Sequence, residues 1–145
     1  MLSGGEVKYF KLYELVDQRT YEEEGDAAWE HFTDEILFSL DGLREFFGRP
    51  VTVNNWMAGG HFQFRGFRPA WYQPGVTPGS QHRKGNAIDC DVAGMPANQA
   101  RREIVENKDN PLLAKITRTE DGVNWIHLDC LVLPEGKERI YLFKA

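Results

Sequence analysis

The chain of 145 residues has few cysteines and no long apolar run. Cys90 and Cys130 are the only cysteines, and their spacing fits neither a C-x-x-C motif nor a disulfide framework. Such sparse cysteine usage is typical of proteins in a reducing compartment. No stretch approaches the roughly 18 apolar residues that a membrane-spanning helix requires. We therefore predict a fold without disulfide bonds and without a membrane-spanning segment.

An excess of positive charge is also lacking. The chain has 17 Lys and Arg residues against 22 Asp and Glu residues, which gives a net charge of −5. Proteins that bind nucleic acids usually present a basic surface, so we expect no nucleic-acid partner. The same acidic balance argues against binding to anionic membranes. Residues 1–10 lack the basic segment and apolar run of a secretory signal, so the location that we expect is the cytoplasm.

The length fits a single domain over residues 1–145, and the share of apolar residues, 41%, is sufficient for a core. Apolar residues recur at three- and four-residue spacing from Trp29 to Phe47, which predicts a helix. Asp26 is its expected N-cap and Gly48 its expected terminating glycine. A shorter amphipathic segment over residues 10–16 is expected to pack beside this helix.

After residue 50 the pattern changes to short alternating segments separated by glycine and proline. The predicted strands cover residues 51–53, 61–65, 86–92, 115–120, 123–133 and 138–143, and a helix is predicted over residues 98–106. Asp121-Gly122 is a strong turn signal that joins two of these strands in a hairpin. The irregular segment 69–80 has a length that is usually functional in a small domain. Helices followed by a small, mostly antiparallel sheet make an α+β fold.

Two of the predicted strands carry polar residues on one face only. Side chains alternate strictly between the two faces of a strand. In strand 86–92, Asp89 therefore lies opposite an apolar face, and in strand 123–133 so do His127 and Asp129. If the two strands are neighbours in one sheet, Asp89 and His127 converge.

A third ligand is available just before the first of these strands. His82 lies on the preceding turn, where Gly85 can adopt the positive φ that folds the chain back. Two imidazoles and one carboxylate are a common catalytic zinc set, with a fourth position left for water. We therefore expect one zinc ion. Cys90 and Cys130 fall on the core faces and are expected to be buried apolar residues, not ligands.

These residues also resemble a known family motif. The motif consists of His82-x-x-Gly85-x-Ala87-x-Asp89 followed by Trp125-x-His127, and it resembles the metal motif of the M15 family of zinc peptidases. Upstream, Gly66-Phe67-Arg68-Pro69 is similar to the family's Gly-Tyr-Arg segment. The resemblance covers about residues 50 to 130 and implies the Hedgehog/DD-peptidase fold.

The resemblance implies that His82, Asp89 and His127 bind zinc, and that Arg68 and Ser80 contact the substrate. It implies a peptidase that cleaves the stem peptides of peptidoglycan, either as a D,D-carboxypeptidase or as an L,D- or D,D-endopeptidase. A phage endolysin would fit this description, and from the cytoplasm it would need a holin-like route to the cell wall. The residue pattern does not choose the bond that is cleaved, because this choice depends on the shape of the cleft.

The motif leaves the general base unassigned. Many family members carry an acid three residues before the last histidine ligand, where this chain has Asn124, whose amide cannot take a proton from water. Others carry a Glu about six residues before it, which corresponds to Asp121, with Glu120 adjacent. From the tip of an extended hairpin, Asp121 would lie on the order of 20 Å from His127. Asp129 is expected to orient a ligating histidine instead.

The missing acid keeps two further hypotheses open. One is a zinc-stabilised binding module without catalysis, as the relationship of the fold to the Hedgehog signalling domain allows. The other is a phage structural protein that keeps the fold. Bound metal without peptide turnover would distinguish the first from a peptidase, and copurification with virion parts would support the second.

Overall fold

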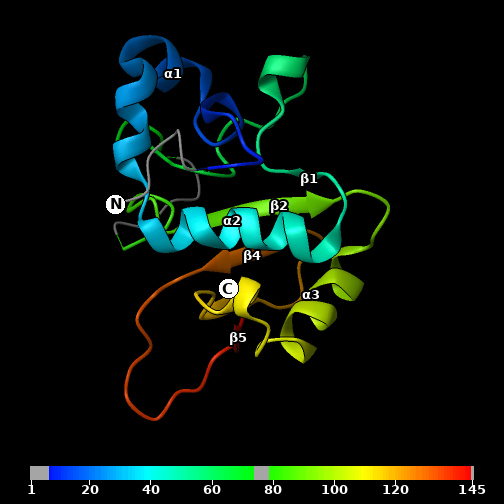
Figure 1. Cartoon of the computed structure of the whole chain (residues 1–145). Coiled ribbons are helices and arrows are strands. Elements are labelled where there is room, and N and C mark those ends of the chain that lie inside the picture. Colours follow the sequence, from blue (N-terminus) through cyan, green and yellow to red (C-terminus); the bar gives the residue numbers. More distant parts are fainter. Residues whose placement is uncertain (1–6, 74–78, 145) are drawn as a thin grey trace.

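The protein has an α+β fold in which α2 packs across one face of a small sheet (Figure 1). The computed structural model describes residues 7–73 and 79–144. The helices in this part of the chain are α1 (Gln18–Glu24), α2 (Asp34–Phe47) and α3 (Ala97–Glu106), with short 3-10 helices η1 (Leu12–Glu14), η2 (Gly25–His31), η3 (Trp56–Ala58) and η4 (Pro111–Leu113). The strands are β1 (Val51–Thr52), β2 (Ala87–Val92), β3 (Arg118–Glu120), β4 (Ile126–Asp129) and β5 (Tyr141–Phe143).

Helix α2 begins later than the apolar spacing predicts. The N-cap is Thr33, not Asp26, because the Thr33 hydroxyl accepts a hydrogen bond from the backbone N–H of Ile36. The residues expected to form the first turns belong to η2, which is a separate 3-10 helix. The predicted end is confirmed, since Gly48 closes α2 in the left-handed conformation at φ 63°. An apolar stripe continues through a bend between two helices, so spacing alone does not mark the cap.

The strands form a sheet of order β1-β2-β4-β3-β5, in which only β3 and β5 pair in parallel. The mostly antiparallel sheet of the sequence prediction is thus confirmed. Strands β3 and β4 pair antiparallel, as the predicted hairpin requires, with Arg118 opposite Asp129. Their connection runs over residues 121–125 and is longer than a two-residue turn, so β4 is shorter than expected.

The strand predicted at residues 61–65 is wrong. Side chains, and not a neighbouring strand, satisfy its backbone donors: the N–H of Phe62 donates to Asn55 Oδ1 at 2.8 Å, and that of Arg65 donates to Asn54 Oδ1 at 3.0 Å. The segment is nevertheless held against the sheet, since Asp89 donates its N–H to the Arg65 carbonyl at 2.7 Å. It therefore runs beside β2 as an ordered loop.

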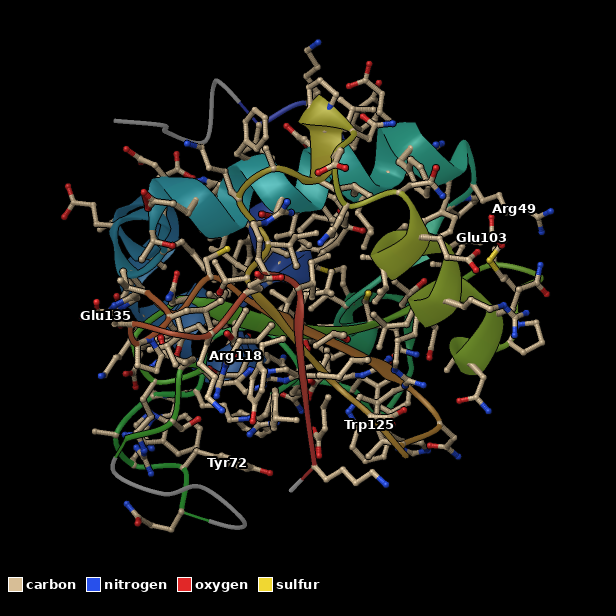
Figure 2. The ribbon with its side chains drawn as sticks, turned by 90° about the horizontal axis from the view of Figure 1, so that it is seen from below. Arg49, Tyr72, Glu103, Arg118, Trp125 and Glu135 are labelled. Carbon is tan, nitrogen blue, oxygen red and sulfur yellow. The ribbon has the colours of Figure 1, made fainter. Side chains whose placement is uncertain are left out.

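The core lies between α2 and the apolar face of the sheet. Its fully buried side chains include Ile36, Leu37, Leu40 and Leu43 of α2, Ile88 and Cys90 of β2, and Ile126 and Leu128 of β4. Figure 2 shows α2 along one side of the sheet, with Trp125 and Tyr72 on the other side. The strand alternation that sends apolar residues toward α2 therefore sends the polar residues to the opposite face.

The irregular segment predicted over residues 69–80 has no regular structure in its described part, and residues 74–78 lie outside the described residues. Its beginning is anchored, since Arg83 donates to the carbonyls of Pro69 at 3.0 Å and Tyr72 at 2.8 Å. The Tyr72 ring stacks on Phe64 with 3.8 Å between centroids. Among the described helices, none has the length and apolar character needed to cross a membrane.

Gly85 allows the turn before β2 to pack closely against the backbone of His31, which a residue with a Cβ atom would prevent. It has φ 64°, and a Cβ atom there would overlap the carbonyl oxygen of His31. Gly25 has a similar φ of 57°, but open space surrounds its Cβ position. We expect Gly25→Ala to cost about 1 kcal/mol of unfolding free energy and Gly85→Ala about 3 kcal/mol or more. Urea unfolding measures both, and equal costs would contradict the close packing at Gly85.

Both cysteine thiols are buried on the core face, as predicted. Burial raises the pKa of Cys130 to about 11 and that of Cys90 far above its usual range. We expect the folded protein at pH 8 to resist thiol alkylation, because the reactive thiolate is scarce and shielded. Mass spectrometry should find two modified thiols after unfolding in denaturant. Rapid modification of the native protein would show that this core opens readily.

Candidate metal centre

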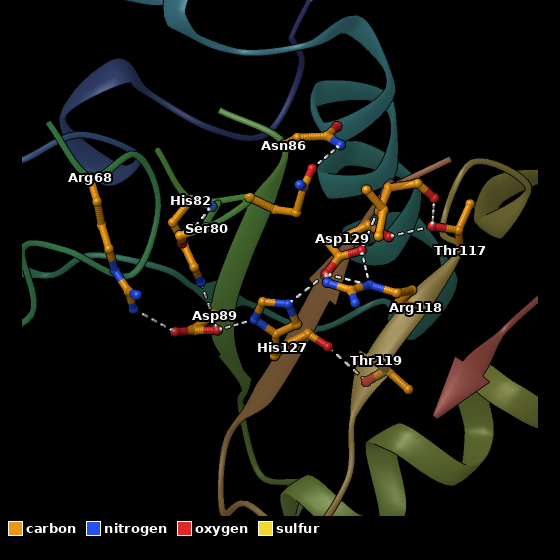
Figure 3. A network of polar contacts seen from close by, with 12 residues as sticks. Arg68, Ser80, His82, Asn86, Asp89, Thr117, Arg118, Thr119, His127 and Asp129 are labelled. Atoms are coloured by element: carbon orange, nitrogen blue, oxygen red, sulfur yellow. Dashed lines mark hydrogen bonds and ion pairs between the residues drawn. The ribbon is translucent and has the colours of Figure 1, made fainter. Parts of the chain in front are cut away.

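The pairing of β2 with β4 brings the central residues of the site together. In this antiparallel pair Asp89 is directly opposite His127, as strand alternation predicts for neighbouring strands. His82 reaches them from the turn before β2, where its carbonyl accepts hydrogen bonds from Arg68 and Gly85. The exposed fractions of His82, Asp89 and His127 are only 4%, 7% and 7%. Three segments thus place two imidazoles around one buried carboxylate (Figure 3).

The distances in this group suit a metal ion. Oδ1 of Asp89 lies 3.4 Å from Nε2 of His82 and 2.9 Å from Nδ1 of His127. One ligand atom from each residue lies within 4.8 Å of the other two. Metal–ligand distances of about 2.0–2.2 Å in a tetrahedral site place the ligand atoms about 3.4 Å apart. The three side chains can therefore hold one metal ion after small adjustments.

The other nitrogen of each imidazole is also held. Nδ1 of His82 lies 2.9 Å from the Gly66 carbonyl, which only accepts hydrogen bonds, so Nδ1 carries a proton and Nε2 is the nitrogen that faces Asp89. Nε2 of His127 lies 2.9 Å from Oδ2 of Asp129. Such partners fix the tautomer and orientation of a ligating histidine. This contact agrees with the orienting position expected of Asp129.

Arg118 supports this arrangement, and the sequence did not reveal its position. It donates to both carboxylate oxygens of the fully buried Asp129, from Nε at 2.9 and 3.1 Å and from Nη2 at 2.7 Å. Burial alone would raise the pKa of Asp129, but the hydrogen bonds from His127 and Arg118 hold this pKa below its usual range. Strand alternation would have indicated Arg118 only if the register of β3 against β4 had been known.

Charges alternate through the group. Burial would raise the pKa of Asp89, but hydrogen bonds from His127 and His82 outweigh burial and keep this pKa well below its usual range. For His127, burial opposes the charged form, yet the carboxylates of Asp129 and Asp89 raise the pKa to about 9. Because both carboxylates accept, the His127 ring donates from both nitrogens in the absence of a metal. A bound cation would take the place of the proton on Nδ1.

The two residues expected to contact a substrate lie beside these ligands. Arg68 donates from Nη2 to Oδ2 of Asp89 at 3.2 Å and from Nε to the Phe64 carbonyl at 2.7 Å. The hydroxyl of Ser80 accepts from the backbone N–H of His82 at 3.2 Å. Both therefore stabilise the immediate surroundings of the metal ligands, and both also line the open space in front of them.

That open space is a hollow of about 450 Å³ lined by Arg68, Gly79, Ser80, Gln81, His82, Asp89, Arg118, Glu120, Trp125, His127 and Phe143. Of the two acids considered for the general base, only Glu120 lines it. The β3–β4 register, continued by one residue, places Glu120 opposite His127. Asp121 lines a different hollow, beside α3. Asn124 does not line the hollow in front of the metal ligands. The metal ligands therefore open onto a polar cleft whose described lining residues include one acid, Glu120, besides the ligand Asp89.

Asp129→Asn keeps the shape of the side chain and removes its charge. We expect the affinity for Zn²⁺ to fall about 10- to 100-fold, because His127 loses the carboxylate that orients it and makes it more basic. Competition against a chelating dye measures the affinity. Asp91→Asn is the matched control, since Asp91 is on β2 with its side chain 52% exposed, and it should leave the affinity unchanged. Equal affinities for the two variants would contradict the assigned contact.

Comparisons of this chain with protein-family models, with curated proteins and with solved structures find no match. The fold and the geometry of the site are therefore the observations from which a function can be argued. Within the described residues, these observations amount to a buried His82–Asp89–His127 group that opens onto a polar cleft.

Proposed function

We propose that this protein is a zinc-dependent peptidase that cleaves the stem peptides of peptidoglycan, as the resemblance to the M15 family implies. One observation carries the proposal: His82, Asp89 and His127 converge at the wall of a hollow that also contains Arg68 and Glu120. These are the parts that hydrolysis of an amide bond requires, namely a metal-ligand set, a hydrogen-bond donor for the carbonyl and a group that transfers protons.

Zinc is the metal that we propose for the site. Two neutral imidazole nitrogens and one carboxylate oxygen are a frequent ligand set for catalytic zinc, and they leave a position free toward the cleft. When bound, the ion supplies Lewis-acid activation of a water molecule and of the substrate carbonyl. The orientation of both imidazole rings suits this role, because each directs one nitrogen toward Asp89.

Arg68 is proposed to hold the substrate carbonyl. Its side chain is 20% exposed, and contacts with the described residues use two of its five N–H groups, one with Asp89 and one with the Phe64 carbonyl. The remaining donors can stabilise negative charge that develops on the carbonyl oxygen. Ser80, on the same wall, is proposed to bind the backbone of the substrate.

Glu120 is proposed as the general base. It takes a proton from the attacking water and returns a proton to the leaving amine as the C–N bond breaks, so that the hydroxyl remains on the new carboxyl group. The support is its place on the cleft wall and its register position across from His127. Asp121 is the weaker candidate, since it lines the hollow beside α3.

The alternative of a zinc-stabilised binding module keeps the same metal site without turnover. It is favoured by Asn124, which stands where many M15 members carry an acid and which is exposed. The cytoplasmic location and the exclusion of nucleic-acid partners stay predictions from the sequence.

The test combines metal content with digestion of muropeptides. We expect about one zinc per chain in the wild type and in Glu120→Gln, and a loss of zinc in Asp89→Asn. Glu120→Gln should lower kcat about 100-fold or more, because the amide cannot accept the proton. Asp121→Asn, one residue further along, is the matched control and should retain both zinc and activity.

Two outcomes would decide against the proposal. Absence of zinc after reloading would remove the metal site, and bound zinc without any new muropeptide product would favour the binding module. If Asp121→Asn, and not Glu120→Gln, abolished turnover while zinc stayed bound, the assignment of the base would be wrong.

A further inference from the structure

A second hollow adjoins the first one at the candidate ligand Asp89. It has about 400 Å³ and is lined by Phe62, Arg65, Asp89, Asp91, Asn124 and Trp125. Asp89 and Trp125 line both hollows, so the ligand Asp89 has open space on two sides. The two hollows have similar volumes, about 450 and 400 Å³. The two hollows therefore adjoin at Asp89 and Trp125, one on each side of this pair.

The position of Trp125 between the hollows is fixed from behind. Arg101 of α3 is only 4% exposed, and its Nη2 donates to the carbonyls of Val123 and Trp125 at 2.8 Å each. Its Nη1 donates to Asn98 on the same helix at 2.8 Å. The β3–β4 connection that carries Trp125 is thus tied to α3, and the two-sided cleft is a built feature of the fold.

The charges of the cleft do not suit a terminal carboxylate. Each of the three arginines on its described lining already faces a carboxylate: Arg68 faces Asp89 at 3.2 Å, Arg118 faces Asp129 at 2.7 Å, and Arg65 faces Asp91 at 3.0 Å. The described lining residues include no lysine. A carboxypeptidase must bind the charged end of its substrate, and a cation without a carboxylate partner binds such an end most strongly.

The second hollow instead offers an apolar surface. Phe62 is 43% exposed, and the Arg65 guanidinium lies over its ring at 4.3 Å from the centroid. Such a ring can cover the uncharged part of a peptide chain that continues past the reacting bond. Asn124 also lines this hollow, and its side-chain amide can hydrogen-bond to a peptide backbone.

From the two-sided cleft and its paired arginines we propose that the protein is an endopeptidase, whose substrate continues on both sides of the cleaved bond. One part of the peptide lies in the hollow of Arg68 and Glu120, and the other part lies against Phe62 and Trp125. Water adds across the internal amide bond and yields a carboxylate and an amine on two peptide fragments. This inference rests on the proposed peptidase function and selects the bond within it.

The test uses the zinc-loaded full chain and three substrates: a stem pentapeptide with a free C-terminal carboxylate, the same peptide with a C-terminal amide, and a cross-linked muropeptide dimer. Mass spectrometry identifies the bond that is cleaved. We expect cleavage at an internal bond. The value of kcat/KM for the amide should lie within about twofold of that for the free acid, because binding does not depend on a cation that pairs with the terminal carboxylate.

Phe62→Ala tests the second hollow. We expect kcat/KM for internal cleavage to fall about tenfold with zinc content unchanged, because the extended peptide loses an apolar contact surface. Phe38→Ala is the matched control: Phe38 is 40% exposed but lies on α2, on the other side of the sheet, and its loss should leave kcat/KM unchanged.

Release of only the C-terminal residue, abolished by amidation, would overturn the endopeptidase inference and leave the peptidase proposal standing. Wild-type kcat/KM in Phe62→Ala would also overturn it, since the second hollow would then have no part in binding. No cleavage of any of the three substrates by zinc-loaded protein would overturn the proposed function itself.

Discussion

The buried carboxylate of Asp89 is the interaction on which the arrangement of the site depends. A charge that is removed from water is stable only when other charges or hydrogen bonds surround it. Asp89 is 7% exposed, and the imidazoles of His82 and His127 and the guanidinium of Arg68 surround its two oxygens. Its own N–H draws in a further segment by donating to the Arg65 carbonyl. The turn before β2, strand β4 and the loop around residues 65–68 are therefore all bound to one residue, Asp89.

The same compensation continues away from Asp89 as a chain of alternating charges (Figure 3). His127 joins Asp89 to Asp129, and Arg118 of β3 closes the chain with a bidentate ion pair. His127 and Asp129 each have a partner on both sides, so the His127 ring is oriented before any cation is present. A metal ion in this position would need little rearrangement of the protein, which is the requirement for a site with a defined geometry.

The shape and charges of the cleft constrain what can bind there, in addition to the geometry of the metal ligands. Trp125 is tied to α3 through Arg101, and hollows lie on both sides of Asp89 and Trp125. The ion pairs that neutralise the arginines of the cleft leave donors for uncharged peptide groups. On the proposed function, the electrostatics that stabilise the buried acids thus also select among substrates.

The sequence by itself determined the features that are local in origin. Strand alternation separates Asp89 and His127 from the buried Cys90, and Gly48 marks the end of α2. The register of β3 against β4 placed Glu120, and not Asp121, in the cleft. The sequence of neither strand determines this register by itself.

The predictions from the sequence that were wrong or missing also concern contacts between separate segments of the chain. The segment at residues 61–65 alternates like a strand, but the side chains of Asn54 and Asn55 satisfy its donors before a ladder can form. Likewise, only the tertiary structure could show Arg118 behind Asp129 or a second hollow beside Trp125. A period of two residues assigns each side chain to a face of its own strand, whereas the partner across that face is chosen by the packing of the whole chain.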